Sequence, residues 1–272
     1  MLHMAPTGST AVTTPGEDIS CRQDLVPFYD EHGFLILRQV FQPEEIDALA
    51  SEAQTLLTRT ELIDTANLRC RWQTDVASGE CIFDCFDPVI DIGPVCRYFA
   101  TDERILAPLR AIYRDTAHLF KDKLIFKRPG AKGYDLHQDF IGWDTFPESF
   151  VTVLVAIDAT NATNGATEVF SGYHQQGYLS PRDGNYHPLT ADAVDPARGV
   201  LLELEPGDVA FFGGFTPHCS GPNHSGQLRR QVCWSSNDGR DGGDQRAAHY
   251  REFEAWLRTK YAEYGKTGVW FR

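Results

Sequence analysis

The sequence has no long apolar run, no excess of basic residues and no regular cysteine pattern. No stretch approaches the roughly 18–20 apolar residues that cross a bilayer, so a membrane-spanning helix is not expected. Twenty-five Lys and Arg stand against 38 Asp and Glu, and the formal net charge of −13 argues against general nucleic-acid binding. Net charge does not describe a cleft, so a local basic patch stays open.

The cysteines and the N-terminal residues exclude two further classes. Seven irregularly spaced cysteines fit neither a disulfide framework nor a zinc ribbon. We therefore expect free thiols in a reducing compartment and a cytoplasmic localisation. The first twenty residues have no apolar core and almost no positive charge, unlike a secretory signal or transit peptide. We expect residues 1–20 to form a flexible tail, and residues 21–272 to form a single domain.

The N-terminal part alternates between helical and extended patterns. Residues 22–32 are helical by pattern and precede Gly33, which stands where a C-cap glycine is expected. An apolar run over 34–40 predicts a strand, and Pro43 followed by two glutamates is typical of a helix start. The apolar residues that recur at helical spacing in this second helix are Ile46, Leu49, Ala53 and Leu56. The helix is therefore expected to pack one face on a core.

From about Leu119 the pattern becomes that of a β protein. Short β-like runs are separated by Gly, Pro, Asn and Asp, as in an antiparallel sandwich or barrel. A helical pattern returns at residues 247–264. At 42% hydrophobic and 12% aromatic, the composition can fill a large core. We predict an α+β fold with a mainly β core and flanking helices.

The stretch "DLHQDF" holds a histidine and an aspartate two positions apart, His137 and Asp139. In a strand, such residues point to one face and are about 6–7 Å apart at the backbone, which suits binding of one metal ion. His218, which follows the apolar run "GDVAFF", is the best third ligand. Two histidines and a carboxylate are the facial set of non-haem iron(II) oxygenases. Alone, a His-x-Asp pair is more often an ordinary hydrogen-bonded pair.

An arginine strengthens the metal hypothesis. Arg229 stands eleven residues after His218 and begins a β-like run, so a turn can return it to the metal. A buried guanidinium needs an anion and matches a carboxylate in a bidentate way, as a dicarboxylate co-substrate would provide. Arg230 is expected to face the opposite side of the strand. Either arginine in isolation is more often a solvated surface charge.

Together, "HQD" and "HCSGPNHSGQLR" make the sequence resemble the phytanoyl-CoA dioxygenase family of Fe(II)/2-oxoglutarate oxygenases. The segments "FYDEHGFLILRQVFQPEEIDAL" and "NGATEVFSGYH" are also similar to that family, so the resemblance covers about residues 25–235. It implies a double-stranded β-helix of the jelly-roll type with helices packed outside. It implies Fe(II), 2-oxoglutarate and O2 as cofactor and co-substrates.

The resemblance also implies roles for single residues. His137, Asp139 and His218 take the positions of the metal ligands, and Arg229 and Ser220 those that hold 2-oxoglutarate. Halogenases of the family replace the acid with a small residue, so the intact Asp139 implies oxygen chemistry, with hydroxylation first. Desaturation, epoxidation or ring closure are variants.

The substrate is expected to be a small molecule. A basic island upstream of His137 places Lys123 and Lys127 on one face of a predicted strand with Ile125. These lysines could hold an anionic substrate such as an organophosphonate or an amino-acid derivative, or the co-substrate. A solvated strand edge that discourages aggregation is an equal alternative. Further candidate substrate contacts are Tyr134, Trp143, His174 and Arg182, the last two in a lid-like insert over 173–199.

Three other functions stay open. The first is a tailoring oxygenase that acts on a larger natural-product scaffold. The second is a metal-dependent isomerase or hydrolase of the cupin type, which Arg229 at the family spacing disfavours. The third is a non-catalytic binding protein, in which a lost ligand is expected, whereas all three are present. We expect no nucleic-acid or membrane partner, and the sequence does not indicate an oligomeric state.

Overall fold

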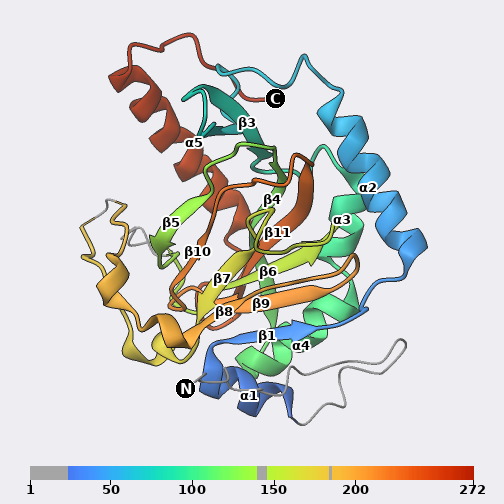
Figure 1. Ribbon diagram of the computed structural model, residues 1–272, viewed down its shortest axis with the longest axis vertical. Coiled ribbons are helices and arrows are strands. Elements are labelled where there is room, and N and C mark those ends of the chain that lie inside the picture. The colour runs from blue at the N-terminus through green and yellow to red at the C-terminus, as the bar shows by residue number, and fades with distance from the viewer. Residues whose placement is uncertain (1–23, 140–145, 184–185) are drawn as a thin grey trace.

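Two antiparallel sheets lie at the centre of the protein in a computed structural model that describes residues 24–139, 146–183 and 186–272 (Figure 1). The larger sheet has the strand order β1-β9-β6-β11-β4-β3-β2, and the smaller sheet has the order β5-β10-β7-β8. The strands of the larger sheet are β1 (Phe34–Leu37), β9 (Val209–Gly213), β6 (Val151–Ala156), β11 (Arg229–Asp238), β4 (Ala117–Lys127), β3 (Cys81–Phe86) and β2 (Cys70–Thr74). Those of the smaller sheet are β5 (Tyr134–His137), β10 (His218–Ser220), β7 (Thr167–Phe170) and β8 (Gly199–Leu201).

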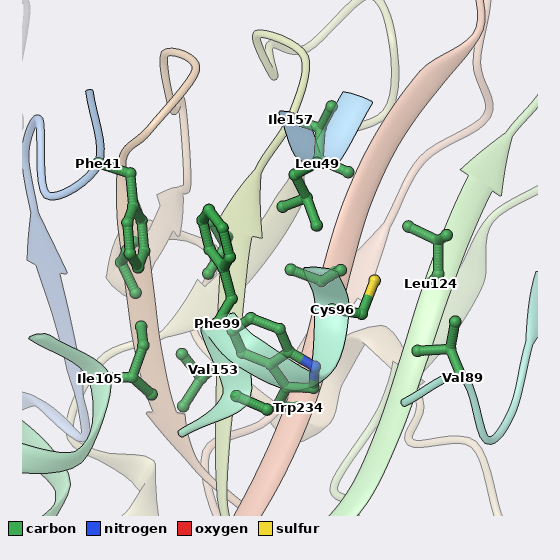
Figure 2. Packing of buried hydrophobic residues seen from close by; sticks show 14 of the residues in the cluster. Phe41, Leu49, Val89, Cys96, Phe99, Ile105, Leu124, Val153, Ile157 and Trp234 are labelled. Carbon is green, nitrogen blue, oxygen red and sulfur yellow. The ribbon is translucent and has the colours of Figure 1, made fainter. Parts of the chain in front are cut away.

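Four helices pack against the outer face of the larger sheet. They are α1 (Leu25–His32), α2 (Pro43–Leu57), α3 (Pro94–Ala100) and α4 (Glu103–Tyr113). Their apolar side chains form one core with Val153, Leu124 and Trp234, which come from three strands. Figure 2 shows Trp234 beneath Phe99 of α3 in this core. The helices thereby close one face of the sheet, and the strands carry apolar residues there at every second position.

The opposite face of the same strands packs against the smaller sheet. Leu154 and Ala156 of β6 share a second core with Val169 of β7 and Leu202. Because both faces of β6 are covered, this strand is buried along its whole length, and its residues are apolar except for Thr152. Polar residues are therefore the exception on this inner face of the larger sheet, and they gather around one cavity.

Most predicted elements are confirmed, with differences at their ends. The C-cap glycine after α1 is in the left-handed conformation, with a φ of 77° at Gly33. Pro43 begins α2, and the buried residues of this helix are those expected from the spacing: Ile46, Leu49, Ala53 and Leu56. β1 ends at Leu37 and is shorter than the predicted strand over 34–40, because Gln39 has a φ of 53° and turns the chain. Within the insert over 173–199, the described residues (173–183 and 186–199) form three short 3-10 helices and no strand before β8.

The C-terminal helix α5 (Arg246–Glu263) covers the end of β4 (Figure 1). A polar network joins the two elements, since Arg246 Nε donates to the Asp122 carboxylate at 2.7 Å and the Asp122 amide donates to the Tyr250 hydroxyl at 2.9 Å. His249 is buried on the same helix face, and its ring lies 4.3 Å from that of Phe120. None of the helices among the described residues is long and apolar enough to span a membrane.

Acid is expected to destabilise the protein through His249. Burial, and after it the charge of Lys121, lowers the pKa of His249 from 6.5 to about 3. The unfolded chain therefore binds this proton at a higher pH than the folded protein, and stability falls as the pH drops from 6.5 towards 3. The loss of unfolding free energy between about pH 7 and about pH 5 can be measured by urea unfolding of the wild type and of His249→Phe. The variant should lose less stability over that interval, and an equal loss in both proteins would refute the assignment.

Candidate metal and co-substrate site

Three potential metal ligands meet on the inner side of the smaller sheet: His137, Asp139 and His218. Their ligand atoms all lie within 4.8 Å of one another. Asp139 Oδ1 lies 3.6 Å from Nε2 of His218 and 3.9 Å from Nε2 of His137. Two imidazoles and one carboxylate in this arrangement can bind one metal ion and leave several of its positions open, which is the donor set of non-haem iron sites.

The pairing of two short strands brings the histidines together. His218 at the start of β10 is opposite His137 at the end of β5, and the two ring centroids are 4.3 Å apart. The expectation that Asp139 lies on the same strand is wrong, because β5 ends at His137. The chain bends beyond it, and the Asp139 amide donates to Gly214 O at 3.1 Å. This bend still turns the carboxylate towards both imidazoles.

Hydrogen bonds set which nitrogen each histidine presents. Nδ1 of His137 lies 2.7 Å from Asp135 O, and Nδ1 of His218 lies 3.0 Å from Thr216 O. A carbonyl only accepts, so Nδ1 carries the proton in both rings and Nε2 is left as the free donor atom for a metal. Burial, and after it the neighbouring His218, lowers the pKa of His137 to about 4. The ring is therefore neutral near pH 7, as a metal ligand must be.

The carboxylate is held in the same way. The Thr152 hydroxyl donates to Asp139 Oδ2 at 2.9 Å, which leaves Oδ1 directed at the two imidazoles. Burial acts to raise the pKa of Asp139, but the two histidines lower it below its usual value. The site therefore contains an ionised carboxylate and the neutral imidazole of His137, both oriented before any metal binds.

A cavity between the two sheets contains these ligands and extends to Arg229. Arg229 is 2% exposed, and its Nη2 donates to Gly165 O at 3.0 Å. Its Nε is buried and has no hydrogen-bond partner among the described residues. Arg230 points to the other side of the sheet, as expected, and pairs with Asp158 at 2.8 Å.

Lys127 lies beside Arg229 at the same end of the cavity. Its ammonium group donates to Gly165 O at 2.9 Å, Ser220 Oγ at 3.0 Å and Gly221 O at 2.5 Å. Burial, and after it the charge of Arg229, lowers the pKa of Lys127 to about 7. Two buried cations this close lack sufficient negative charge, so this end of the cavity is suited to an anion.

One carboxylate also reaches this end. Asp84 of β3 is 2% exposed and accepts a hydrogen bond from the Tyr134 hydroxyl. Burial raises the pKa of Asp84, although nearby cations act in the opposite direction. Tyr134 is 42% exposed as a residue, but its hydroxyl end lies inside the cavity.

The other predicted substrate residues are divided by position. Lys123 lines the cavity, as Lys127 and Tyr134 do. His174 is not among the lining residues, and its Nε2 lies 3.1 Å from Asp30 O. Arg182 is also absent from the lining, since it lies over the Tyr178 ring and pairs with Glu148 at 3.5 Å. Trp143 lies outside the described residues.

The alternative of a solvated strand edge does not hold for the lysines of β4. This strand lies between β11 and β3 in the larger sheet and is not an edge strand. Lys121, Lys123 and Lys127 occupy alternate positions on its inner face and line the cavity. Lys132, in contrast, is exposed and pairs with Asp135 at 3.1 Å.

Sequence reasoning missed several lining residues. Asp84 had a usable signal, because a lone carboxylate within the apolar strand "CIFDCF" requires a buried partner. Thr152 had a weaker one, as a hydroxyl within "VTVLVA". Phe253 of α5 also lines the cavity, and no sequence pattern predicts that the C-terminal helix reaches it.

The sequence matches the family described as phytanoyl-CoA dioxygenase (PhyH) over residues 29–231. It is 29% identical over 163 residues to a 2-aminoethylphosphonate dioxygenase from uncultured bacterium HF130_AEPn_1, covering 59% of this chain and 61% of that protein. It is 31% identical over 173 residues to a methylphosphonate hydroxylase from Gimesia maris, covering 63% of each. The match thus spans less than two thirds of the length of both relatives.

Solved structures share the fold. EctD from S. alaskensis, determined with 2-oxoglutarate and 5-hydroxyectoine, aligns with a TM-score of 0.67 at 19% identity over 85% of this chain and 81% of that one. The epimerase SnoN from nogalamycin biosynthesis aligns with a TM-score of 0.65 at 20% identity over 79% and 82%. The predicted jelly-roll fold with flanking helices is confirmed. Since the family match covers most of the sequence, the chain belongs to the phytanoyl-CoA dioxygenase family.

Proposed function

We propose that the protein is an Fe(II)- and 2-oxoglutarate-dependent dioxygenase that hydroxylates a C–H bond of a small molecule. One observation carries this proposal. A single cavity holds the three potential metal ligands and, at another position, the buried cations Arg229 and Lys127. A dicarboxylate co-substrate bound to the metal needs the second feature, because its distal carboxylate requires a cationic partner.

In this proposal His137, Asp139 and His218 hold the iron. The donor set fits Fe(II), because imidazole suits iron and a 2-His-1-carboxylate triad leaves positions open. When bound, the iron supplies the oxidising chemistry with O2 and 2-oxoglutarate. The chain contributes oriented Nε2 atoms, a carboxylate held by Thr152, and a cavity partly closed to water by phenylalanines.

The distal carboxylate of 2-oxoglutarate is assigned to Arg229 and Ser220, with Lys127 as an additional contact. Lys127 already binds Ser220 Oγ at 3.0 Å, so a carboxylate placed at the guanidinium comes close to all three groups. The unsatisfied Nε of Arg229 supports an anion at this end. Lys127 is thus moved from the candidate substrate contacts to the co-substrate.

A small anionic substrate is favoured over a large natural-product scaffold. The cavity is lined by lysines and phenylalanines, and two similar proteins bear the names 2-aminoethylphosphonate dioxygenase and methylphosphonate hydroxylase. Ectoine dioxygenase from Bordetella bronchiseptica, 28% identical over 232 residues, is also named for a small molecule.

Anaerobic addition of Fe(II) and 2-oxoglutarate is expected to give a weak visible charge-transfer band. Iron alone should not give it, because the band requires the keto acid to chelate the metal. Succinate release in air over a panel of small phosphonates and carboxylates then identifies the substrate. Absence of the band in folded, iron-loaded protein would move the assignment to the isomerase or hydrolase class.

A further inference from the structure

Lys123, in the middle of β4, lines the cavity. Its register partner on β11 is the uncharged side chain Cys233. No hydrogen bond or ion pair joins its ammonium group to another of the described residues. The charges of Asp87 and Asp139 attract this half-buried ammonium from a distance. No hydrogen bond compensates it for its lost hydration, so it can accept an anion directly.

The two other lysines on the same face differ from it. Lys121 pairs with Asp87 at 3.1 Å and lies 4.0 Å from the centre of the Phe253 ring. Lys127 donates three hydrogen bonds at the co-substrate end. Both therefore have close structural partners, whereas Lys123 between them makes no hydrogen bond or ion pair within the part of the chain that the structure describes.

Charge balance in the cavity leads to the same residue, if the proposed function holds. Iron(II) is neutralised by Asp139 together with the keto-acid carboxylate of 2-oxoglutarate. Arg229 and Lys127 are neutralised by Asp84 together with the distal carboxylate. Lys121 is neutralised by Asp87, which Arg71 also approaches at 3.6 Å from outside the cavity. Both acidic groups of the co-substrate are thus used, and the positive charge of Lys123 is left over.

The position of Lys123 suits a compact molecule next to the metal. Cys233 pairs with Lys123 on one side and with Leu154 of β6 on the other, and all three line the cavity. Thr152, two residues from Leu154 on the same face, holds Asp139. Two strand spacings, about 10 Å, therefore separate β4 from the strand that supports the metal ligand. A molecule that contacts both the lysine and the metal is therefore compact.

We propose that Lys123 binds the acidic group of the substrate, and that the substrate is a compact oxyacid such as a short phosphonate or carboxylate. This rests on the proposed function and names the substrate class for the same site. The acid group sits on the ammonium by a charge-assisted hydrogen bond. Phe146, Phe150 and Phe253 line the cavity around the remainder of the molecule. Neutral molecules of the same shape should bind poorly, because they leave the lysine uncompensated.

Equilibrium binding to the anaerobic Fe(II)–2-oxoglutarate complex tests this without turnover. The probes are methylphosphonate, 2-aminoethylphosphonate, propionate and the neutral dimethyl ester of methylphosphonate, and each is followed by its shift of the charge-transfer band. At least one anion should bind to the wild type and the ester should not. Lys123→Gln should weaken binding of that anion about tenfold or more. Lys123→Arg, which keeps the charge, should recover part of the loss.

The matched control is Lys132→Gln, because Lys132 is an exposed lysine near the same site, paired with Asp135. It should bind every probe as the wild type does. All variants should form the band at unchanged 2-oxoglutarate concentrations, which also shows that they fold. Three results would overturn this inference and leave the proposed function standing. They are a band that does not respond to the anions, equal binding of the ester and the anions, and unchanged anion binding in Lys123→Gln. A higher 2-oxoglutarate requirement in Lys123→Gln would assign the lysine to the co-substrate and overturn it too. Absence of the band in the wild type instead overturns the proposed function.

Discussion

His137→Ala is expected to lose both bound iron and succinate release. Removing one of three ligands leaves an imidazole and a carboxylate, and two ligands hold a divalent metal poorly. Asp139→Ala and His218→Ala should give the same result. Iron per chain, measured after loading and desalting under anaerobic conditions, gives the effect directly, and activity should fall to background. Thr152→Val should have a smaller effect, about a tenfold to hundredfold weaker affinity for iron, since it removes a hydrogen bond to the ligand.

His187→Ala is the control for these variants. His187 is half-buried and lies 2.9 Å from Asp183, outside the cavity lining, so its removal should leave iron content and turnover unchanged. Thermal unfolding of each apo variant separates loss of metal from loss of fold. Stoichiometric iron in His137→Ala would show that other residues bind the metal.

Arg229→Ala is expected to raise the concentration of 2-oxoglutarate needed for half-maximal activity by about tenfold to a hundredfold. Arg229 is the buried guanidinium at the end of the cavity that already contains Ser220 and Lys127. The iron ligands are untouched, so iron content should not change. The readout is the 2-oxoglutarate dependence of both the anaerobic charge-transfer band and succinate release.

The neighbouring arginine provides a matched control. Arg230→Ala removes the same charge one position later, but its side chain pairs with Asp158 on the other side of the sheet. Some loss of stability is expected there, and no change in the 2-oxoglutarate dependence. If Arg230→Ala raises the requirement and Arg229→Ala does not, the co-substrate assignment has to move to Arg230.

The two arginines illustrate why period-two reasoning worked well in this protein. Successive side chains of a strand point to opposite faces. Once Arg229 is assigned to the cavity, Arg230 is therefore expected on the other face of the sheet. The same rule placed Lys123 and Lys127 together on one face of β4. Reasoning of this kind failed at Asp139, because it assumed that the strand continued, and nothing in "DLHQDF" marks the bend after His137.

Local patterns in the sequence determined the class of fold, the extent of α2, the three potential metal ligands and the arginine at their spacing. Each of these depends on periodicity or on short-range chemistry, which one chain segment expresses by itself. Tertiary structure alone decided that β4 lies inside the sheet, that Asp84 and Thr152 reach the site, and that α5 adds Phe253. It also decided that Lys121 forms an ion pair with Asp87, whereas Lys123 forms no ion pair with any described residue. Those properties depend on which distant segments pack together, and the pairing of buried charges follows from that packing.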